Sequence, residues 1–382
     1  MDIKELAQGK LILWGANWSL YTAKIRSYLI KKGIPHIEIC PLHPHYEAYV
    51  QPKIGHFTVP VLEYPNGDIV ADSTDIIYQL EKQFPENPID PANKTLASLA
   101  WFIQYFASEG LPRTFMHYRW TLTTGDENKQ DLDYVIDEFG RSSNYPGQTA
   151  LDYLPMLGIV DGQKEFIEEF TEKLCDILQR HFIKYPYVLG GLPSAADYGL
   201  ISTFYPHLGR DISSSTRIKA RYPCLYRWIE TMNRAQIMDQ ELWNIAPEYF
   251  DPNDLPETVL ELLQLITAIY GPEVMAVADA YHNWLHEVPS RPAGTIVSIT
   301  GQKSNHQAIG MIEYDQYGKT FKRLGLLDPV IRHQEMADKI AEMNQSELND
   351  YKAIMAKVGG QALFDLTLER PIVRDDFCSK LG

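Results

Sequence analysis

Two dipeptides in the N-terminal part of the chain carry groups suited to binding a peptide-like ligand. Pro60 has no backbone N–H and follows Val59 at the start of a strand-forming run, so the neighbouring backbone can pair with an extended peptide. Asp72 and Ser73 stand at the start of a segment with helical apolar spacing. The Ser73 hydroxyl and the first N–H groups of that helix would bind a carboxylate, and Asp72 would accept from an ammonium. These residues predict a site for the zwitterionic end of an α-amino acid.

A third polar segment runs from Gly15 to Thr22 and joins an expected strand to an expected helix. It places the hydroxyls of Ser19 and Thr22 beside the unpaired N–H groups of the helix start, where the helix dipole favours an anion. The segment therefore predicts that this helix start stabilises a negatively charged group.

Regular elements must bring these three motifs together. The expected strands are residues 11–14, 36–39, 61–64 and 69–70, with Pro65 to Asp68 as a tight turn between the last two. Apolar residues recur at helical spacing after two of the motifs, as Tyr21, Ile25, Tyr28, Leu29 and as Ile77, Leu80, Phe84. The order of elements describes an α/β thioredoxin-like domain over residues 1–88.

The chain resembles the soluble glutathione transferases at Val59-Pro60, at Asp72-Ser73 and in the segment that begins at Ser19. The resemblance implies that the Val59-Pro60 backbone pairs with the cysteinyl group of glutathione and that Asp72-Ser73 holds its γ-glutamyl end. It places Ser19 at the position of the residue that activates the thiol, although Leu20 stands where the family usually has proline.

Some roles in this implied site stay open. Asn17, Tyr21 and Thr22 are alternatives to Ser19 for activation of the thiol, since they lie close to it in sequence. The family often contacts the glycine carboxylate of glutathione just before its Val-Pro motif, which makes Lys53 and His56 candidates for that contact.

Ser194 and Asp197 form a Ser-x-x-Asp pattern after a glycine-rich loop, and this resembles the capping box in the helical domain of the same family. In such a box each residue satisfies one N–H group that would otherwise be unpaired at a buried helix start. The pattern predicts a folding role and no part in catalysis.

Composition shifts divide the chain into three regions. Prolines at 85, 88 and 91 indicate a linker, after which residues 89–250 read as an all-α domain. Residues 251–382 form an extension beyond the family's usual length, mostly helical with short strands expected at 295–300 and 311–314. Apolar spacing within 259–285 suggests two helices there, and no chemistry is assigned to the extension.

Trp101 and Tyr105 form an i, i+4 pair in an aromatic segment of the helical domain, off the apolar stripe around Phe102. The pair predicts an apolar pocket that faces the first domain and accepts a small hydrophobic electrophile. Ordinary packing between the two domains is the alternative.

Composition excludes several classes of function. A net charge of −15 disfavours nucleic acid, and no glycine-rich phosphate loop indicates a nucleotide. Four separated cysteines suit a reducing cytoplasm, and no long apolar run or signal peptide indicates a membrane. The histidines at 43, 45 and 56 lack a completing ligand pattern, so no metal site is expected.

The favoured interpretation is a glutathione transferase that activates the glutathione thiol for attack on a small apolar electrophile, with glutathione as substrate. The alternatives are a non-catalytic glutathione-fold binding or scaffold protein and a glutathione-dependent lyase or isomerase. Disulfide reduction is disfavoured because it requires a cysteine at Ser19 or Thr22. Members of this family usually form homodimers, so the resemblance implies a homodimer.

Overall fold

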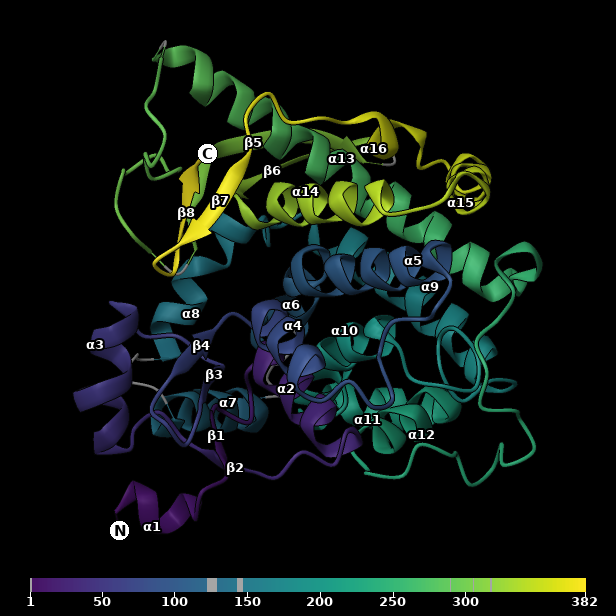
Figure 1. Ribbon diagram of the computed structural model, residues 1–382, viewed down its shortest axis with the longest axis horizontal. Helices are drawn as coiled ribbons and strands as arrows, with labels where there is room; N and C mark the ends of the chain where they lie inside the picture. Colours follow the sequence, from purple (N-terminus) through teal and green to yellow (C-terminus); the bar gives the residue numbers. More distant parts are fainter. Residues whose placement is uncertain (1, 122–128, 143–146, 289, 305, 317) are drawn as a thin grey trace.

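The computed structural model describes residues 2–121, 129–142, 147–288, 290–304, 306–316 and 318–382. An α/β N-terminal domain is followed by a helical region, and a C-terminal extension with helices and two hairpins packs on that region (Figure 1). The predicted fold class is confirmed.

A four-stranded sheet organises the N-terminal domain. Its elements are α1 (Ile3–Ala7), β1 (Leu11–Trp14), α2 (Leu20–Lys31), β2 (His36–Ile39), the π-helical η1 (Tyr46–Val50), α3 (Gln51–Ile54), β3 (Val61–Glu63), β4 (Ile69–Ala71) and α4 (Ser73–Gln83). The strand order is β2-β1-β3-β4, with β1 parallel to β2 and every other pair antiparallel. The thioredoxin-like order expected from the sequence is present.

The helical region runs from α5 to α12. Its elements are α5 (Lys94–Tyr105), the π-helical η2 (Phe106–Gly110), α6 (Pro112–Trp120), α7 (Lys129–Ser142), α8 (Gly147–Tyr153), the 3-10 segment η5 (Pro155–Leu157), α9 (Lys164–Phe182), α10 (Ala195–Thr203), the π-helical η6 (Phe204–Leu208), α11 (Ile212–Arg221) and α12 (Pro223–Met232). α5 is buried almost along its whole length, because it packs on α10 on one side and on α14 and α15 of the extension on another (Figure 1).

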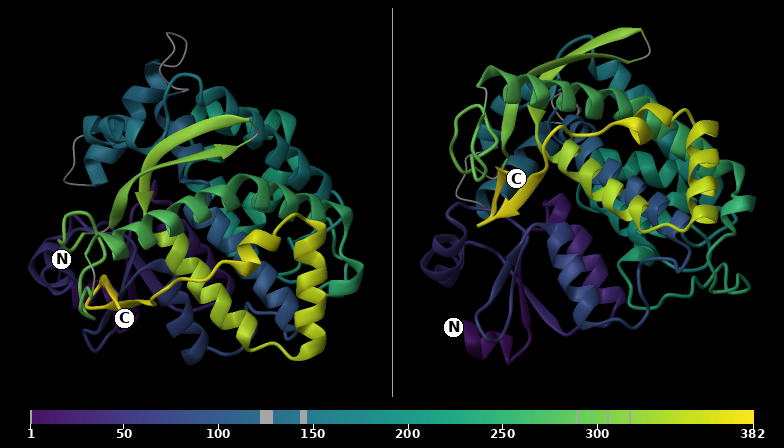
Figure 2. Two further views of the ribbon diagram at one scale, coloured as in Figure 1. Left: turned by 90° about the horizontal axis from the view of Figure 1, so that it is seen from above. Right: turned by 45° about the horizontal axis from the view of Figure 1, so that its top comes forward.

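The extension begins after the 3-10 segment η7 (Pro252–Asp254). Its elements are α13 (Glu257–Glu287), β5 (Ala308–Gln316), β6 (Lys319–Leu326), α14 (Asp328–Ala341), α15 (Gln345–Lys357), α16 (Gln361–Asp365), β7 (Ile372–Asp375) and β8 (Cys378–Leu381). β5 pairs antiparallel with β6, and β7 with β8. The β7–β8 hairpin reaches the N-terminal domain (Figure 2).

The expectation of two helices within residues 259–285 is wrong, because α13 is one helix of 31 residues with Pro272 inside it. Proline removes one hydrogen bond of a helix, but burial of apolar residues on both sides of Pro272 holds the helix together. By length and composition α13 could cross a membrane, yet 61% of its most apolar stretch is buried inside the protein, as in a core helix.

The strand expected at 295–300 is also absent from the described structure. Ile296 makes only an isolated bridge to Lys380, so this segment is an extended loop tied to β8. The strand expected at 311–314 is present and longer than predicted, as the central part of β5.

Candidate functional site

The three polar motifs meet at one end of the strands of the N-terminal sheet, here called the sheet edge. The register aligns Trp14 of β1 with Val61 of β3, and Val61 with Ala71 of β4. Since β3 is antiparallel to both β1 and β4, the chain leaves β1, enters β3 and leaves β4 at the same end of the sheet. The segments that hold Ser19, Val59-Pro60 and Asp72-Ser73 therefore all begin or end there.

Ser19 is the N-cap residue of α2. Its hydroxyl oxygen accepts from the Thr22 backbone N–H at 3.2 Å, and the residue is 4% exposed. The hydroxyl proton of Ser19 stays available for an anion at the helix start, because the cap uses only the oxygen. Ser19 thus lies at the N-terminus of α2, and its role in activating a thiol stays a prediction.

Among the alternatives to Ser19, only Tyr21 donates its proton elsewhere, whereas the contacts of Thr22 and Asn17 use an acceptor oxygen, as that of Ser19 does. The Thr22 hydroxyl accepts from the Ala16 N–H at 3.4 Å, and the Asn17 amide oxygen accepts from Arg26 at 3.4 Å. The Tyr21 hydroxyl donates to the Ser108 carbonyl oxygen of η2 at 3.0 Å, and burial raises the pKa of this phenol well above its usual value. Tyr21 is thus a contact between α2 and the helical region.

The peptide bond between Val59 and Pro60 is cis, and β3 begins one residue later. Within the described part of the chain, Val59 makes no backbone hydrogen bond. Its N–H and C=O are therefore available to an extended peptide, as the sequence predicts.

Asp72, and not Ser73, is the N-cap residue of α4, which begins at Ser73. Asp72 adopts a φ of 74°, and its Oδ1 accepts from the backbone N–H groups of Thr74 at 2.7 Å and Asp75 at 3.4 Å. The cap therefore already occupies one carboxylate oxygen of Asp72 and two of the helix N–H groups.

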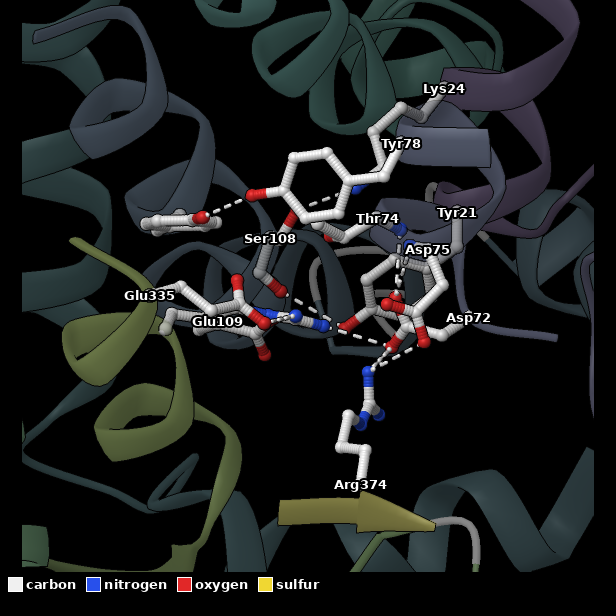
Figure 3. A network of polar contacts seen from close by, with 12 residues as sticks. Tyr21, Lys24, Asp72, Thr74, Asp75, Tyr78, Ser108, Glu109, Glu335 and Arg374 are labelled. Atoms are coloured by element: carbon white, nitrogen blue, oxygen red, sulfur yellow. Dashed lines mark hydrogen bonds and ion pairs between the residues drawn. The ribbon is translucent and has the colours of Figure 1, made fainter. Parts of the chain in front are cut away.

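The other oxygen of Asp72 is held by two arginines of the C-terminal extension, of which Figure 3 labels Arg374. Arg332 of α14 lies 2.9 Å and Arg374 of β7 lies 2.7 Å from Asp72 Oδ2. Sequence analysis assigned no chemistry to the extension and missed both residues. No sequence signal links them to Asp72, because 260 positions separate Asp72 from Arg332.

Arg332 is the centre of a buried ion-pair cluster. Its side chain is 3% exposed and also contacts Glu335 at 2.8 Å and Glu109 of η2 at 3.5 Å. Burial opposes ionisation of Asp72, but the charges of Arg332, Arg374 and Lys24 outweigh it and hold the pKa of Asp72 well below its usual value.

Three other members of the cluster have shifted pKa values. Burial, with the nearby Asp328 charge, raises the pKa of Glu109 to about 8. Burial and the Asp72 charge raise the pKa of Asp75 to about 6. Lys24 is fully buried and donates to the Ser108 hydroxyl at 3.2 Å, and burial lowers its pKa to about 8. At neutral pH most of Glu109 is therefore protonated, and most of Lys24 is charged.

The structure does not bring Lys53 to this sheet edge. Its ammonium donates to the Tyr49 hydroxyl at 2.6 Å and to the Gly67 carbonyl at 2.9 Å, in the turn between β3 and β4. That turn lies at the opposite end of β3 from Pro60, so Lys53 is not placed for the predicted contact. His56 lies half-buried in the segment that leads to Val59.

Trp101 and Tyr105 do not face an open cleft, because the extension covers them. Both are 1% exposed. The Trp101 indole donates to Asp90 at 2.6 Å, and the Tyr105 hydroxyl is hydrogen-bonded to that of Tyr78 at 2.9 Å. Lys339 of α14 lies over the Trp101 ring, 4.5 Å from its centroid. The structure therefore shows the packing alternative for this pair.

A cavity of about 160 Å³ lies beside Tyr105, where the helical region meets the extension. Its lining is mostly apolar and aromatic, with Arg332 and His333 as charged or titratable members. The lining includes Phe102, Tyr270, Met336, Tyr351, Met355 and Phe364.

The capping box predicted at the start of α10 is present. The Asp197 carboxylate accepts from the Ser194 N–H at 3.0 Å and from the Ser194 hydroxyl at 3.1 Å. It also accepts from the Val188 N–H at 3.0 Å and the Trp228 indole at 3.1 Å. Burial raises the pKa of Asp197 to about 6. The box thus joins α10 to the preceding loop and to α12.

Among the residues that the structure describes, no three His, Cys, Asp or Glu side chains come together as a metal site. The charged cluster at Asp72 is instead balanced by arginines and a lysine of the chain itself.

Comparisons with known proteins point to one family. Residues 13–88 match the family described as "Glutathione S-transferase, N-terminal domain". No curated protein sequence matches the chain.

Several solved structures match the chain at low identity. The glutathione transferase URE2P5 from Phanerochaete chrysosporium is 10% identical over 62% of this chain and 94% of that chain, with a TM-score of 0.37. The β-etherase LigF from Sphingobium sp. strain SYK-6 is 17% identical over 62% of this chain and 99% of that chain, with a TM-score of 0.42. A glutathione S-transferase from Rhodospirillum rubrum F11 is 13% identical over 66% of this chain and 99% of that chain, with a TM-score of 0.39.

Proposed function

Because residues 13–88 of this chain belong to the glutathione S-transferase N-terminal domain family, we propose that the chain binds glutathione and activates its thiol. The observation that carries the proposal is the register of β1, β3 and β4. It gathers the Ser19, Val59-Pro60 and Asp72-Ser73 segments at one sheet edge.

Each segment supplies one part of the binding. The unpaired backbone of Val59 hydrogen-bonds the cysteinyl residue of glutathione in an extended conformation, as one more strand would. The first turn of α4 receives the γ-glutamyl end. These contacts direct the thiol to the start of α2, where Ser19 lies.

Activation of the thiol requires a lowered pKa, because a free thiol with a pKa near 8.5 is only a few per cent thiolate at neutral pH. The Ser19 hydroxyl donates a hydrogen bond to the thiolate, and the N-terminus of α2 adds a favourable dipole. A shift of about two pKa units corresponds to about 2.7 kcal/mol, which one charge-assisted hydrogen bond and a helix terminus can supply. The thiolate would then attack a small apolar electrophile.

Calorimetric titration with glutathione, followed by ultraviolet absorbance of the bound thiolate across pH, tests this proposal. We expect binding with a thiol pKa about two units below 8.5. Ser19→Ala should return most of that shift while glutathione still binds, and the exposed Ser346→Ala serves as the matched control. We also propose that the chain forms a homodimer, as the family resemblance implies, and light scattering on the same sample tests this.

The outcomes separate the function classes. Binding with an unshifted thiol pKa would indicate the non-catalytic binding or scaffold protein instead of a transferase. An unchanged thiol pKa in Ser19→Ala would contradict the role of Ser19. Absence of binding would reject the glutathione site.

A further inference from the structure

Arg374 is the most accessible cation of the cluster around Asp72. Its side chain is 31% exposed, whereas that of Arg332 is 3% exposed. One terminal nitrogen, Nη1, contacts Asp72 Oδ2 at 2.7 Å and Asp75 Oδ2 at 3.5 Å. The other two nitrogens make no hydrogen bond with any residue that the structure describes, and Figure 3 shows them pointing away from both carboxylates. Arg374 therefore has donors to offer a ligand.

The guanidinium of Arg374 lies over the first turn of α4. Asp72 and Asp75, which it contacts, flank Ser73 in that turn. Ser73 is 5% exposed, and its hydroxyl has no hydrogen-bond partner in the described part of the chain. α4 has eleven residues, so its N-terminus carries the partial positive charge of a helix dipole. The first turn of α4 thus carries a buried hydroxyl and a helix N-terminus, and the guanidinium of Arg374 contacts the two residues that flank this hydroxyl.

Arg332 has a different role, because it is buried and both of its terminal nitrogens already donate hydrogen bonds. It contacts Asp72, Glu335 and Glu109, and it lies 5.9 Å from the centroid of the Tyr105 ring. It is a positioning residue that fixes the Asp72 carboxylate from the buried side.

The charges around this position favour a carboxylate over an ammonium as the group that Arg374 meets. Both oxygens of Asp72 already accept hydrogen bonds or ion pairs, so an incoming ammonium would share Oδ2 with two guanidinium groups. Two further negative charges act on Arg374, namely Asp328 and Asp75, and Nη1 of Arg374 already contacts Asp75. Glu109 and Glu335 lie on the Arg332 side of the cluster.

We propose that Arg374, together with Ser73 and the first turn of α4, binds the α-carboxylate at the γ-glutamyl end of glutathione. The C-terminal extension would then supply a specificity-determining residue to a site built by the N-terminal domain. This inference rests on the proposed binding of glutathione.

A double comparison of ligand and variant tests the role of Arg374. The ligands are glutathione and γ-aminobutyryl-cysteinyl-glycine, which lacks only the α-carboxylate. Wild type should bind the analogue about 10- to 100-fold more weakly, as expected for loss of a charge-assisted contact. Arg374→Gln should weaken glutathione binding by up to that factor and change binding of the analogue less than about threefold, since the analogue lacks the group that Arg374 is proposed to bind.

Two further variants control the comparison. Lys380→Gln removes a cation from the same hairpin, where the Lys380 ammonium lies 2.6 Å from Asp375 and makes no ion pair with Asp72 among the described residues, so it should leave both affinities unchanged. Arg374→Lys keeps the positive charge but lacks the planar guanidinium group. It should bind glutathione more tightly than Arg374→Gln and more weakly than wild type.

The possible results distinguish a wrong assignment of Arg374 from a wrong assignment of the glutathione site. Equal loss of affinity for both ligands in Arg374→Gln, or no loss for either, would overturn the assignment of Arg374 while leaving glutathione binding intact. If Arg374→Gln does not fold, equal binding of glutathione and the analogue by wild type would overturn it as well. Binding of neither ligand by wild type would instead reject the glutathione site itself, and the Arg374 contact with it.

Discussion

Arg332 and Asp72 connect two parts of the chain that lie 260 positions apart, through a contact of 2.9 Å between Nη2 and Oδ2. Asp72 caps the helix that follows the hairpin of the N-terminal domain, and Arg332 projects from the first long helix after the β5–β6 hairpin. The same carboxylate thus begins a helix and anchors the extension. The stability of the whole chain should depend on the charge of this one side chain.

Asp72→Asn should lower the free energy of unfolding at pH 7 by about 2 to 4 kcal/mol, because it leaves the buried Arg332 and the partly exposed Arg374 without their shared partner. Asparagine tolerates the positive φ and keeps an oxygen for the cap, so the backbone should be retained. The folded pKa of Asp72 is depressed, so its contribution is present above about pH 4 and is lost as the pH falls through the folded pKa.

Urea unfolding at pH 7 and at about pH 3 measures this difference, which should narrow in acid. Asp279→Asn, at an exposed position of α13, is the matched control. Equal stability of wild type and Asp72→Asn at pH 7 would show that the arginines do not depend on this carboxylate.

Glu109→Gln should flatten the dependence of stability on pH in the neutral range. Burial raises the folded pKa of Glu109 to about 8, whereas the unfolded group ionises near 4.5. Between these values the folded state binds more protons than the unfolded state, so wild type should lose stability as the pH rises. Unfolding midpoints at about pH 5.5, 7 and 8.5 should fall less in the variant than in wild type, since Asp75 and Asp197, with raised pKa values of about 6, still titrate in both. The exposed Glu313→Gln should behave as wild type.

Asp197→Ala should destabilise the protein far more than Ser194→Ala does. Asp197 accepts from two backbone N–H groups and the Trp228 indole, so its loss leaves three buried donors unpaired, at a cost of about 3 kcal/mol or more. Ser194→Ala removes one cap hydroxyl and should cost about 1 kcal/mol. Chemical denaturation of both variants makes the comparison, and similar losses would mean that Asp197 acts only as the reciprocal half of the capping box.

Arg113→Met should change stability by less than about 1 kcal/mol, whereas Arg113→Ala should cost about 3 kcal/mol. Arg113 is 2% exposed and has neutral partners, the Tyr314 hydroxyl at 3.0 Å and the Gln316 amide oxygen at 3.4 Å. Phe170 and Phe321 lie on either side of it. An apolar chain of similar length fills this space without a buried charge, and thermal unfolding would show a large loss in Arg113→Met if the charge itself were needed.

Local patterns predicted the N-terminal domain well, because its strands and helices follow each other closely and carry clear turn and cap residues. The positions of Ser19 and Val59-Pro60 follow from that order, since the register of three antiparallel strands decides which loops share an edge. α13 escaped prediction because Pro272 usually ends a helix, and only tertiary burial overrides that preference.

The charged half of the site could not be predicted from local patterns. Arg332 and Arg374 resemble ordinary surface arginines in sequence, and only the packing of α14 and β7 brings them to Asp72. The same packing covers Trp101 and Tyr105, whose i, i+4 spacing suggested an open face. Whether Asp72 or Ser73 caps α4 depends on the residue at which the helix begins, and sequence patterns locate helix boundaries poorly.

The separation of Asp72 from its arginines also affects the order of events during synthesis. A ribosome that adds about 5 to 20 residues per second needs about 10 to 50 seconds to make the 260 residues between Asp72 and Arg332, and it makes Arg374 later still. The N-terminal domain can therefore fold while Asp72 has no guanidinium partner. During that interval neither arginine neutralises the Asp72 carboxylate. The site of a nascent chain would therefore carry more negative charge than that of the finished protein.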